Sequence, residues 1–193
     1  MSLFDLTEFF KLSSALNYNL SAASLNRYTV LMYIIDDKRL VADENKDREY
    51  KGILMEALGY LFSAYSHKRR RLGPMAVLHP LRSAAIFTRF FDEFNLLNLL
   101  TQLFHDVLED VQPVQFEVQK WKSMEEQLYN LMDRIGPARE AKLTSNLLHL
   151  TRVEGETYYH YIGRLLDNAR NSPELVAVKL ADRLDNTLDM RID

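Results

Sequence analysis

The chain has 193 residues, which is the usual length of one domain and enough to bury a sizeable core. Apolar residues make up 47% of it, which excludes a disordered chain, and a net charge of only −3 gives no argument for nucleic-acid or membrane binding. The sequence contains no cysteine, so a metal ion would have to be held by His, Asp or Glu.

The first ten residues, MSLFDLTEFF, carry acids where a secretory signal would carry Lys or Arg. The apolar runs are too short to span a membrane. Together with the lack of cysteine, these features predict a cytoplasmic protein that has neither a membrane nor a nucleic acid as its partner. They leave homo-oligomerisation open.

Helical periodicity runs through most of the chain, which contains only 6 Gly and 5 Pro. The expected helices span residues 3–16, 22–36, 50–66, 79–92, 95–111, 115–135, 137–150, 155–171 and 173–190. The charged stretch 36–51 is expected to be a solvated loop. It marks off an N-terminal helical extension, residues 1–50, from a main domain, residues 51–193. No strand pattern competes, so the predicted fold class is an all-α helical bundle.

Two helix boundaries carry recognisable signals. Asn95 can cap the helix that follows it, because its side chain can accept a hydrogen bond from an unpaired amide of the first turn. Gly136 and Pro137 separate two further helices.

The most informative segment is residues 96–111, LLNLLTQLFHDVLEDV. On an ideal helix its large apolar residues share one side, and a polar quartet lies within an arc of roughly 140° on the other. The quartet is His105, Asp106, Glu109 and Asp110. An acidic run on a helix is usually a solvated face. Here no Lys or Arg compensates it at i+4 spacing, so the carboxylates repel one another unless a cation lies among them.

Two further candidate ligands lie on other predicted helices. His79 begins the helix HPLRSAAIF, and Asp182 lies in LVAVKLADRLDNTLDM, where it shares a polar face with Lys179 and Asn186. Each alone is weak, because a single His at a helix start is more often a structural hydrogen-bonding group. The combination is stronger, since a His, a His-Asp pair and an Asp then follow in order on three helices.

That order resembles the metal-binding signature of the HD-superfamily phosphohydrolases. The sequences around these residues are similar to the hydrolase domain of the Rel/SpoT stringent-response enzymes and of the small stand-alone (p)ppGpp hydrolases. The similar segments are RRLGPMAVLHP (70–80), LFHDVLEDV (103–111) and VAVKLADRLDN (176–186). The resemblance covers roughly residues 55–190 and implies an HD-domain helical bundle. It also implies one divalent metal ion, Mn²⁺ in most of the family. The ligands would be His79, His105, Asp106 and Asp182.

The resemblance also implies roles for residues that do not bind the metal. Glu109 and Asp110 match the acidic pair associated with hydrolysis. Arg70 and Arg71 match a basic pair that lines the nucleotide site, and Asn186 matches an Asn that contacts the nucleoside. Lys179 is expected to add positive charge for the substrate phosphates.

The chain departs from the family pattern in two places. Residues 73–76 read Gly-Pro-Met-Ala where the family usually has Gly-x-Pro-Tyr. Family members also continue with another helix after Asn186, whose place would be filled by further chain or by the N-terminal 50 residues. Three functions therefore stay open: a (p)ppGpp 3′-pyrophosphohydrolase, an HD phosphohydrolase for another nucleotide or a phosphorylated cofactor such as NADPH, and a non-catalytic nucleotide-binding regulatory domain.

Overall fold

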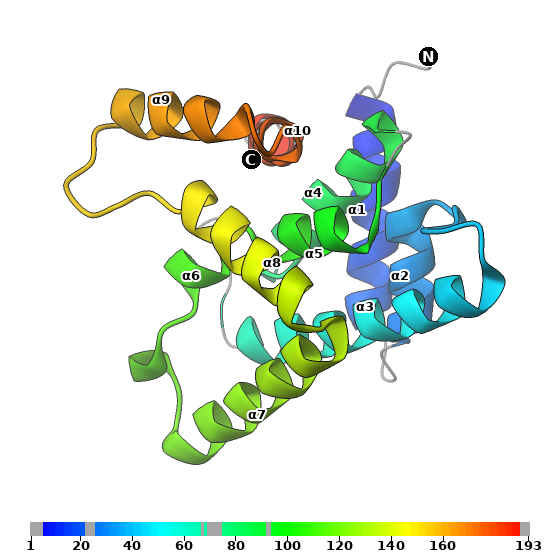
Figure 1. The fold of residues 1–193 in the computed structure, drawn as a ribbon. Helices are drawn as coiled ribbons and strands as arrows, with labels where there is room; N and C mark the ends of the chain where they lie inside the picture. The colour runs from blue at the N-terminus through cyan, green and yellow to red at the C-terminus, as the bar shows by residue number, and fades with distance from the viewer. Residues whose placement is uncertain (1–5, 22–25, 67, 69–74, 92–93, 190–193) are drawn as a thin grey trace.

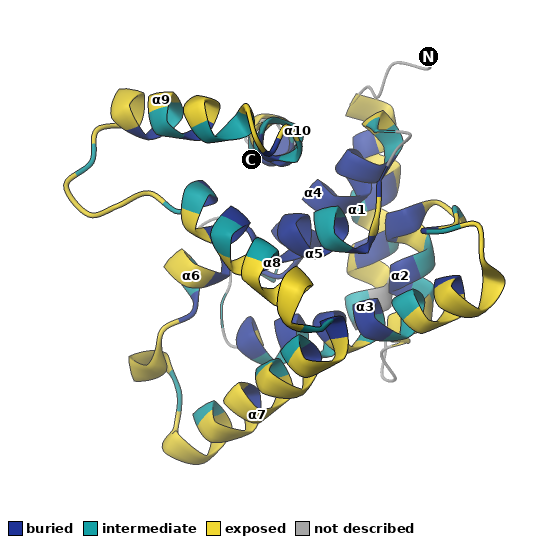
Figure 2. Cartoon of the chain, viewed as in Figure 1, coloured by how far each residue is buried: buried dark blue, intermediate teal, exposed yellow. Residues whose placement is uncertain are grey.

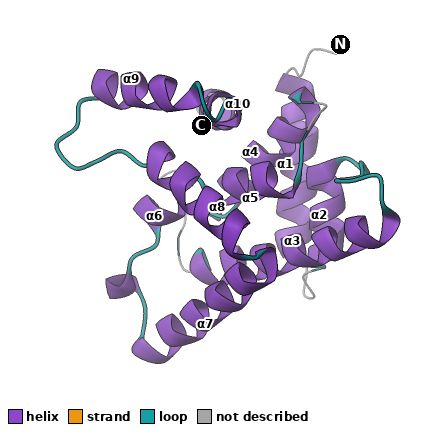
Figure 3. Ribbon diagram, in the orientation of Figure 1, coloured by secondary structure: helices purple, strands orange, loops and turns teal. Residues whose placement is uncertain are grey.

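The structure is a computed structural model that describes residues 6–21, 26–66, 68, 75–91 and 94–189. In these ranges the fold is all-α, as predicted, and contains no β-strand (Figure 3). The elements are α1 (Leu6–Ser21), α2 (Arg27–Ile35), α3 (Glu44–Ala64), α4 (Leu78–Phe90), α5 (Leu96–Phe104), α6 (Val107–Asp110), the 3₁₀ turn η1 (Pro113–Gln115), α7 (Val118–Ile135), α8 (Pro137–Leu150), α9 (Tyr158–Ala169) and α10 (Glu174–Asp189). Among them we find none with the combined length and apolar character that a bilayer-crossing helix requires.

Helix α4 lies at the centre of the bundle and positions the other helices (Figure 1). Every residue from Leu78 to Thr88 is buried, so α4 has no solvent face before its last two residues (Figure 2). α1, α2, α5 and α10 pack around it, while α3, α7 and α8 continue the bundle on the side of α5. One hydrophobic core runs from Phe9 of α1 to Leu188 of α10. Burial of this apolar surface is the main force that holds the helices together.

The predicted helix-end signals at Asn95 and Gly136 are confirmed. The Asn95 side chain accepts a hydrogen bond from the amide of Asn98 at 3.0 Å and begins α5. Gly136 has φ of 82°, a left-handed conformation that favours glycine, and it separates α7 from α8.

The predicted solvated loop at residues 36–51 is wrong in its second half, because α3 begins at Glu44. Asp43 caps this helix by accepting a hydrogen bond from the amide of Lys46 at 2.8 Å. Asp47 then pairs with Lys51 one turn later, at 2.8 Å. The charged residues are therefore spaced as a helix surface, and opposite charges at i and i+4 support a helix where composition alone indicated a loop.

The prediction of one continuous helix at residues 95–111 is also wrong. α5 ends at Phe104, and α6 starts at Val107 after a turn formed by His105 and Asp106. Nδ1 of His105 donates a hydrogen bond to the carbonyl oxygen of Gln102 at 2.7 Å. An unbroken α-helix would pair that carbonyl with the amide of Asp106. The imidazole therefore competes for a helix acceptor at the point where the helix breaks, and the turn places both side chains on the inside.

Candidate metal centre

Four residues predicted as metal ligands converge in the fold. One ligand atom from each of His79, His105, Asp106 and Asp182 lies within 4.8 Å of the others. The two imidazole Nε2 atoms are 3.2 Å apart. Nε2 of His79 lies 3.3 Å from a carboxylate oxygen of Asp106 and 3.3 Å from one of Asp182. The cluster therefore offers two nitrogens and two oxygens to one point.

Three separate parts of the chain supply these side chains. His79 lies in the first turn of α4, His105 and Asp106 form the turn between α5 and α6, and Asp182 lies in the middle of α10. α4 packs against both α5 and α10, so the bundle itself brings the three parts together. The cluster is consequently a product of tertiary packing and not of one local motif.

Both imidazoles are held so that Nε2 points into the cluster. Nδ1 of His105 donates to the Gln102 carbonyl, and Nδ1 of His79 donates to the Asp185 carboxylate at 2.6 Å. A proton held on Nδ1 leaves the Nε2 lone pair for a metal ion, and such outer partners also fix the orientation of the ring. The arrangement is the one expected of metal-ligating histidines.

The charges within the cluster shift its pKa values in a consistent direction. Burial by itself would lower the pKa of His105, but the carboxylates of Asp106 and Asp182 raise it to about 9. Burial alone would also lower the pKa of His79, but the hydrogen bonds that its ring donates to Asp106, Asp182 and Asp185 raise this pKa well above its ordinary value. The two histidines in turn hold the pKa of Asp106 and Asp182 below the usual range, although burial alone would raise it. Protons and a metal ion would therefore compete for the same atoms.

Solvent reaches the cluster from the side of Asp106. Its side chain is 29% exposed, whereas those of His79, His105 and Asp182 are 7%, 2% and 4% exposed. α6 follows Asp106 directly and carries the predicted catalytic residues Glu109 and Asp110. The open edge of the cluster is thus the edge where a substrate and these acids would meet.

The acids on α6 lie outside the four-residue cluster and have partners of their own. Glu109 is exposed and accepts a hydrogen bond from the backbone amide of Arg152 at 2.8 Å. Asp110 accepts a hydrogen bond from the Tyr65 hydroxyl at 3.2 Å and forms an ion pair with Lys68. Burial and the charge of Asp110 raise the pKa of Tyr65, so its hydroxyl stays protonated and remains a donor.

Two residues predicted to bind substrate contact the carboxylate of Asp182. Nζ of Lys179 lies 2.8 Å from Asp182 Oδ2 and 5.3 Å from the centre of the Tyr161 ring. Nδ2 of Asn186 donates to Asp182 Oδ1 at 2.6 Å. In this structure both residues orient a candidate ligand, and their contact with a substrate stays a prediction.

The predicted basic pair, Arg70 and Arg71, lies outside the described residues. The residues on either side of that segment are placed, however. Lys68 pairs with Asp110, and its carbonyl oxygen accepts a hydrogen bond from the amide of Ala76 at 3.0 Å. Ala76 in turn lies one turn before His79. The two described residues that flank the segment, Lys68 and Ala76, are therefore bonded to each other, and Lys68 is paired with Asp110.

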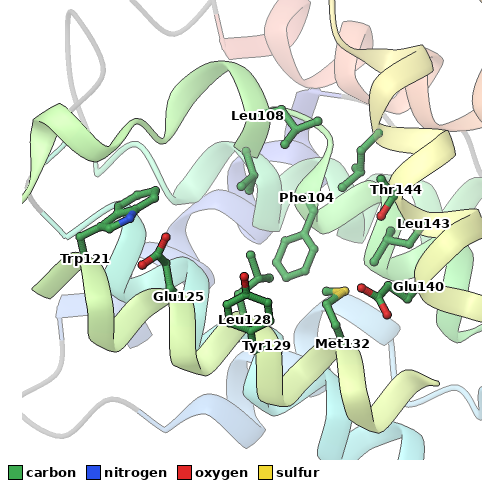
Figure 4. A pocket seen from close by; sticks show the side chains of 12 residues that line it. Phe104, Leu108, Trp121, Glu125, Leu128, Tyr129, Met132, Glu140, Leu143 and Thr144 are labelled. Atoms are coloured by element: carbon green, nitrogen blue, oxygen red, sulfur yellow. The ribbon is translucent and has the colours of Figure 1, made fainter. Parts of the chain in front are cut away.

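A hollow lies on the other, apolar side of the turn formed by His105 and Asp106 (Figure 4). It encloses about 330 Å³ and is lined mainly by apolar side chains of α5, α6, α7 and α8, among them Phe104, Leu108 and Leu143. Glu125 and Glu140 stand among these residues, but none of the four clustered residues lines the hollow. It lacks the convergent nitrogen and oxygen atoms on which a metal centre depends.

Sequence reasoning missed two buried polar residues next to the cluster. Arg82 is 1% exposed and Asp185 is fully buried; Asp185 contacts His79, and Arg82 contacts Asp185. A spacing signal was present, because Arg82 follows His79 by three residues on α4 and Asp185 follows Asp182 by three on α10. Residues three apart share a helix face.

Comparison of the chain with family models, curated proteins and solved structures finds no match. The relationship to the HD superfamily therefore rests on the sequence motifs alone and is a proposal.

Proposed function

We propose that the chain is a metal-dependent phosphohydrolase of the HD type that acts on a phosphorylated nucleotide. The most specific candidate is a guanosine 3′,5′-bis(diphosphate) 3′-pyrophosphohydrolase, because the segments HDVLED and KLADRLDN resemble that family. The observation that carries the proposal is the convergence of His79, His105, Asp106 and Asp182 within 4.8 Å. A buried cluster of two carboxylates and two imidazoles is suited to binding a cation.

The donor set fits a divalent cation. Imidazole nitrogen suits first-row transition metals, and carboxylate oxygen suits Mg²⁺ and Mn²⁺, so a mixed set favours Mn²⁺ or a similar ion. Four ligands also leave positions of a six-coordinate ion for water and a phosphate oxygen. When bound, such an ion would lower the pKa of a water molecule and neutralise phosphate charge.

The residues of α6 supply the remaining chemistry. Glu109 is surplus to the four candidate ligands, and its exposed carboxylate can accept a proton from an attacking water molecule. Its hydrogen bond to the Arg152 amide holds the carboxylate in place. Asp110 anchors Lys68 and, through it, the start of the basic segment that would bind the substrate phosphates. Arginine suits this task because its planar guanidinium binds phosphate oxygens in pairs.

The test is a hydrolysis screen of the purified chain with added Mn²⁺. Its substrates are ppGpp, pppGpp, NADPH and nucleoside monophosphates, and product analysis separates release of 3′-pyrophosphate from release of a single phosphate. We expect 3′-pyrophosphate from ppGpp and pppGpp, and loss of the activity on chelation or in the His105→Gln variant. Cleavage of NADPH or a monophosphate alone would select the second candidate function. Nucleotide binding without turnover of any substrate would select the regulatory domain and overturn the enzyme.

A further inference from the structure

A buried arginine connects α4 to α10 directly behind the candidate metal centre. Nε of Arg82 donates to Asp185 Oδ1 at 2.8 Å, and one terminal nitrogen donates to Asp185 Oδ2 at 3.1 Å. The same terminal nitrogen lies 2.7 Å from a carboxylate oxygen of Asp189. The guanidinium therefore binds Asp185 in a two-point geometry that restricts the rotation of the carboxylate.

The carboxylate that Arg82 holds is the one that contacts His79. Asp185 Oδ2 accepts the proton on Nδ1 of His79 at 2.6 Å, while Nε2 of the same ring faces the cluster. Arg82 and His79 lie one turn apart on α4. Asp185 and the candidate ligand Asp182 lie one turn apart on α10. One contact network thus sets both the ring orientation of His79 and the distance between the two helices that carry ligands.

The N-terminal helix α1 covers the outer side of this network. The fully buried Phe9 ring lies 4.9 Å from the Arg82 guanidinium carbon, and the Ser13 hydroxyl accepts a hydrogen bond from Arg82 at 3.2 Å. Water is therefore excluded from the ion pairs. Exclusion of water strengthens charge-assisted hydrogen bonds.

Stability alone is a poor reason to bury these charges. Removing charged groups from water costs several kcal/mol per ion, and replacing a buried ion pair by apolar residues is often neutral or stabilising. A network retained at the Nδ1 atom of a candidate ligand has a more specific use, because outer partners of a ligating histidine fix its tautomer and direction.

We propose that Asp185 and Arg82 are positioning residues of the metal centre: Asp185 orients His79, and Arg82 orients Asp185. The proposal rests on the proposed function insofar as it takes the cluster to bind a divalent cation. It adds that the affinity for the cation depends on two residues that do not bind it.

The experiment measures Mn²⁺ affinity of the full chain by calorimetry, and thermal unfolding of the metal-free protein, for wild type and variants. Asp185→Asn keeps the size of the side chain but replaces one carboxylate oxygen by a donor. We expect it to weaken Mn²⁺ binding by about 10- to 100-fold, the usual effect of losing such a partner. Arg82→Lys should cause a smaller loss of about three- to tenfold, because a lysine cannot hold both carboxylate oxygens in one plane.

Asp189→Asn is the matched control. It removes a carboxylate from the same guanidinium, on the same helix, without contacting Nδ1 of His79. We expect it to lower the unfolding temperature while Mn²⁺ affinity stays within about threefold of wild type. At saturating Co²⁺, the visible absorption spectrum should change in Asp185→Asn and remain unchanged in Asp189→Asn.

The outcomes separate this inference from the function on which it rests. Unchanged Mn²⁺ affinity in Asp185→Asn overturns the inference and leaves the metal centre standing. Equal losses in the Asp185 and Asp189 variants, in proportion to lost stability, also overturn it and assign the network a purely structural role. A wild-type chain that binds no Mn²⁺ overturns the proposed function before the variants are compared. If Asp185→Asn does not fold, the comparison of Arg82→Lys with Asp189→Asn decides.

Discussion

The buried cluster and the acidic helix α6 that follows it place ionisable side chains in opposite settings. His105 is 3% exposed, and each nitrogen of its ring has a polar partner within the fold. Glu109, one helical turn later, is at the surface and holds a neighbouring loop through a backbone amide. Removing a buried group leaves its partners in the interior without a hydrogen bond, whereas removing a surface group leaves the fold intact. The cluster should therefore govern metal retention, and the acidic helix should govern turnover.

The largest expected effect comes from Glu109→Gln, which tests this division directly. It should lower kcat by a factor of about 10²–10⁴, the usual contribution of a positioned acid or base. The amide oxygen of Gln can still accept the hydrogen bond from Arg152, so the loop should stay in place. Measured metal content should equal that of wild type. Metal content that falls in step with activity would make Glu109 a ligand and erase the contrast between the two regions.

A matched control lies on the same loop. Glu156 accepts a hydrogen bond from the amide of Val153 at 3.1 Å and also pairs with Arg164. Glu156→Gln thus changes a carboxylate that orders the same loop but, unlike Glu109, does not lie on α6 next to the cluster. It should leave turnover near the wild-type level.

An effect of similar size, on KM, is expected when Arg70 and Arg71 are both replaced by Ala. Each lost charge-assisted contact to phosphate should cost about 1.5–3 kcal/mol, which is tenfold or more in KM for a polyphosphate nucleotide. KM for a small artificial phosphodiester should change far less, and the salt dependence of KM should weaken. Arg170→Ala provides the control, since that side chain is 82% exposed and pairs only with Asp167 among the described residues. Equal effects on both substrates would show that Arg70 and Arg71 belong to a solvated turn and do not bind the substrate phosphates.

The smallest effect is the dependence of the free energy of unfolding on pH, which arises from the buried cluster. The pKa of His105 is about 9 in the fold against an ordinary value of 6.5. A raised pKa stabilises the fold fully below about pH 6.5, and this contribution is lost as the pH rises through 9. In the metal-free protein the free energy of unfolding should therefore fall by up to about 3 kcal/mol across this window.

Metal should abolish that alkaline loss, because a bound ion holds both imidazoles in their neutral form and replaces the protons. The measurement is urea unfolding between pH 6 and 10 with Mn²⁺ and with a chelator. A chelated protein whose stability is flat over this range would show that both histidines are already neutral in the fold, with a proton on Nδ1 only. The contrast between buried and exposed acids would then have lost its electrostatic basis.

The helices were predictable because their signals are local. Periodicity of apolar residues placed most of them within a few residues of their observed bounds, and the Asn95 cap and Gly136 marked two ends. Prediction was wrong where local signals compete. Residues 44–51 look like a loop by charge but form a helix by spacing, and the turn at His105 depends on a side chain that replaces a backbone donor.

Patterns along the chain predict the all-α fold class and the identity and order of four candidate ligands, because helix formation and motif spacing depend on neighbouring residues. That His79, His105, Asp106 and Asp182 meet at one point follows, in contrast, from the packing of distant helices. The same packing puts Arg82 and Asp185 behind His79. These contacts join residues about one hundred positions apart, as from His79 to Asp185. They form only when apolar burial packs α10 onto α4, an association that is not encoded in either segment alone.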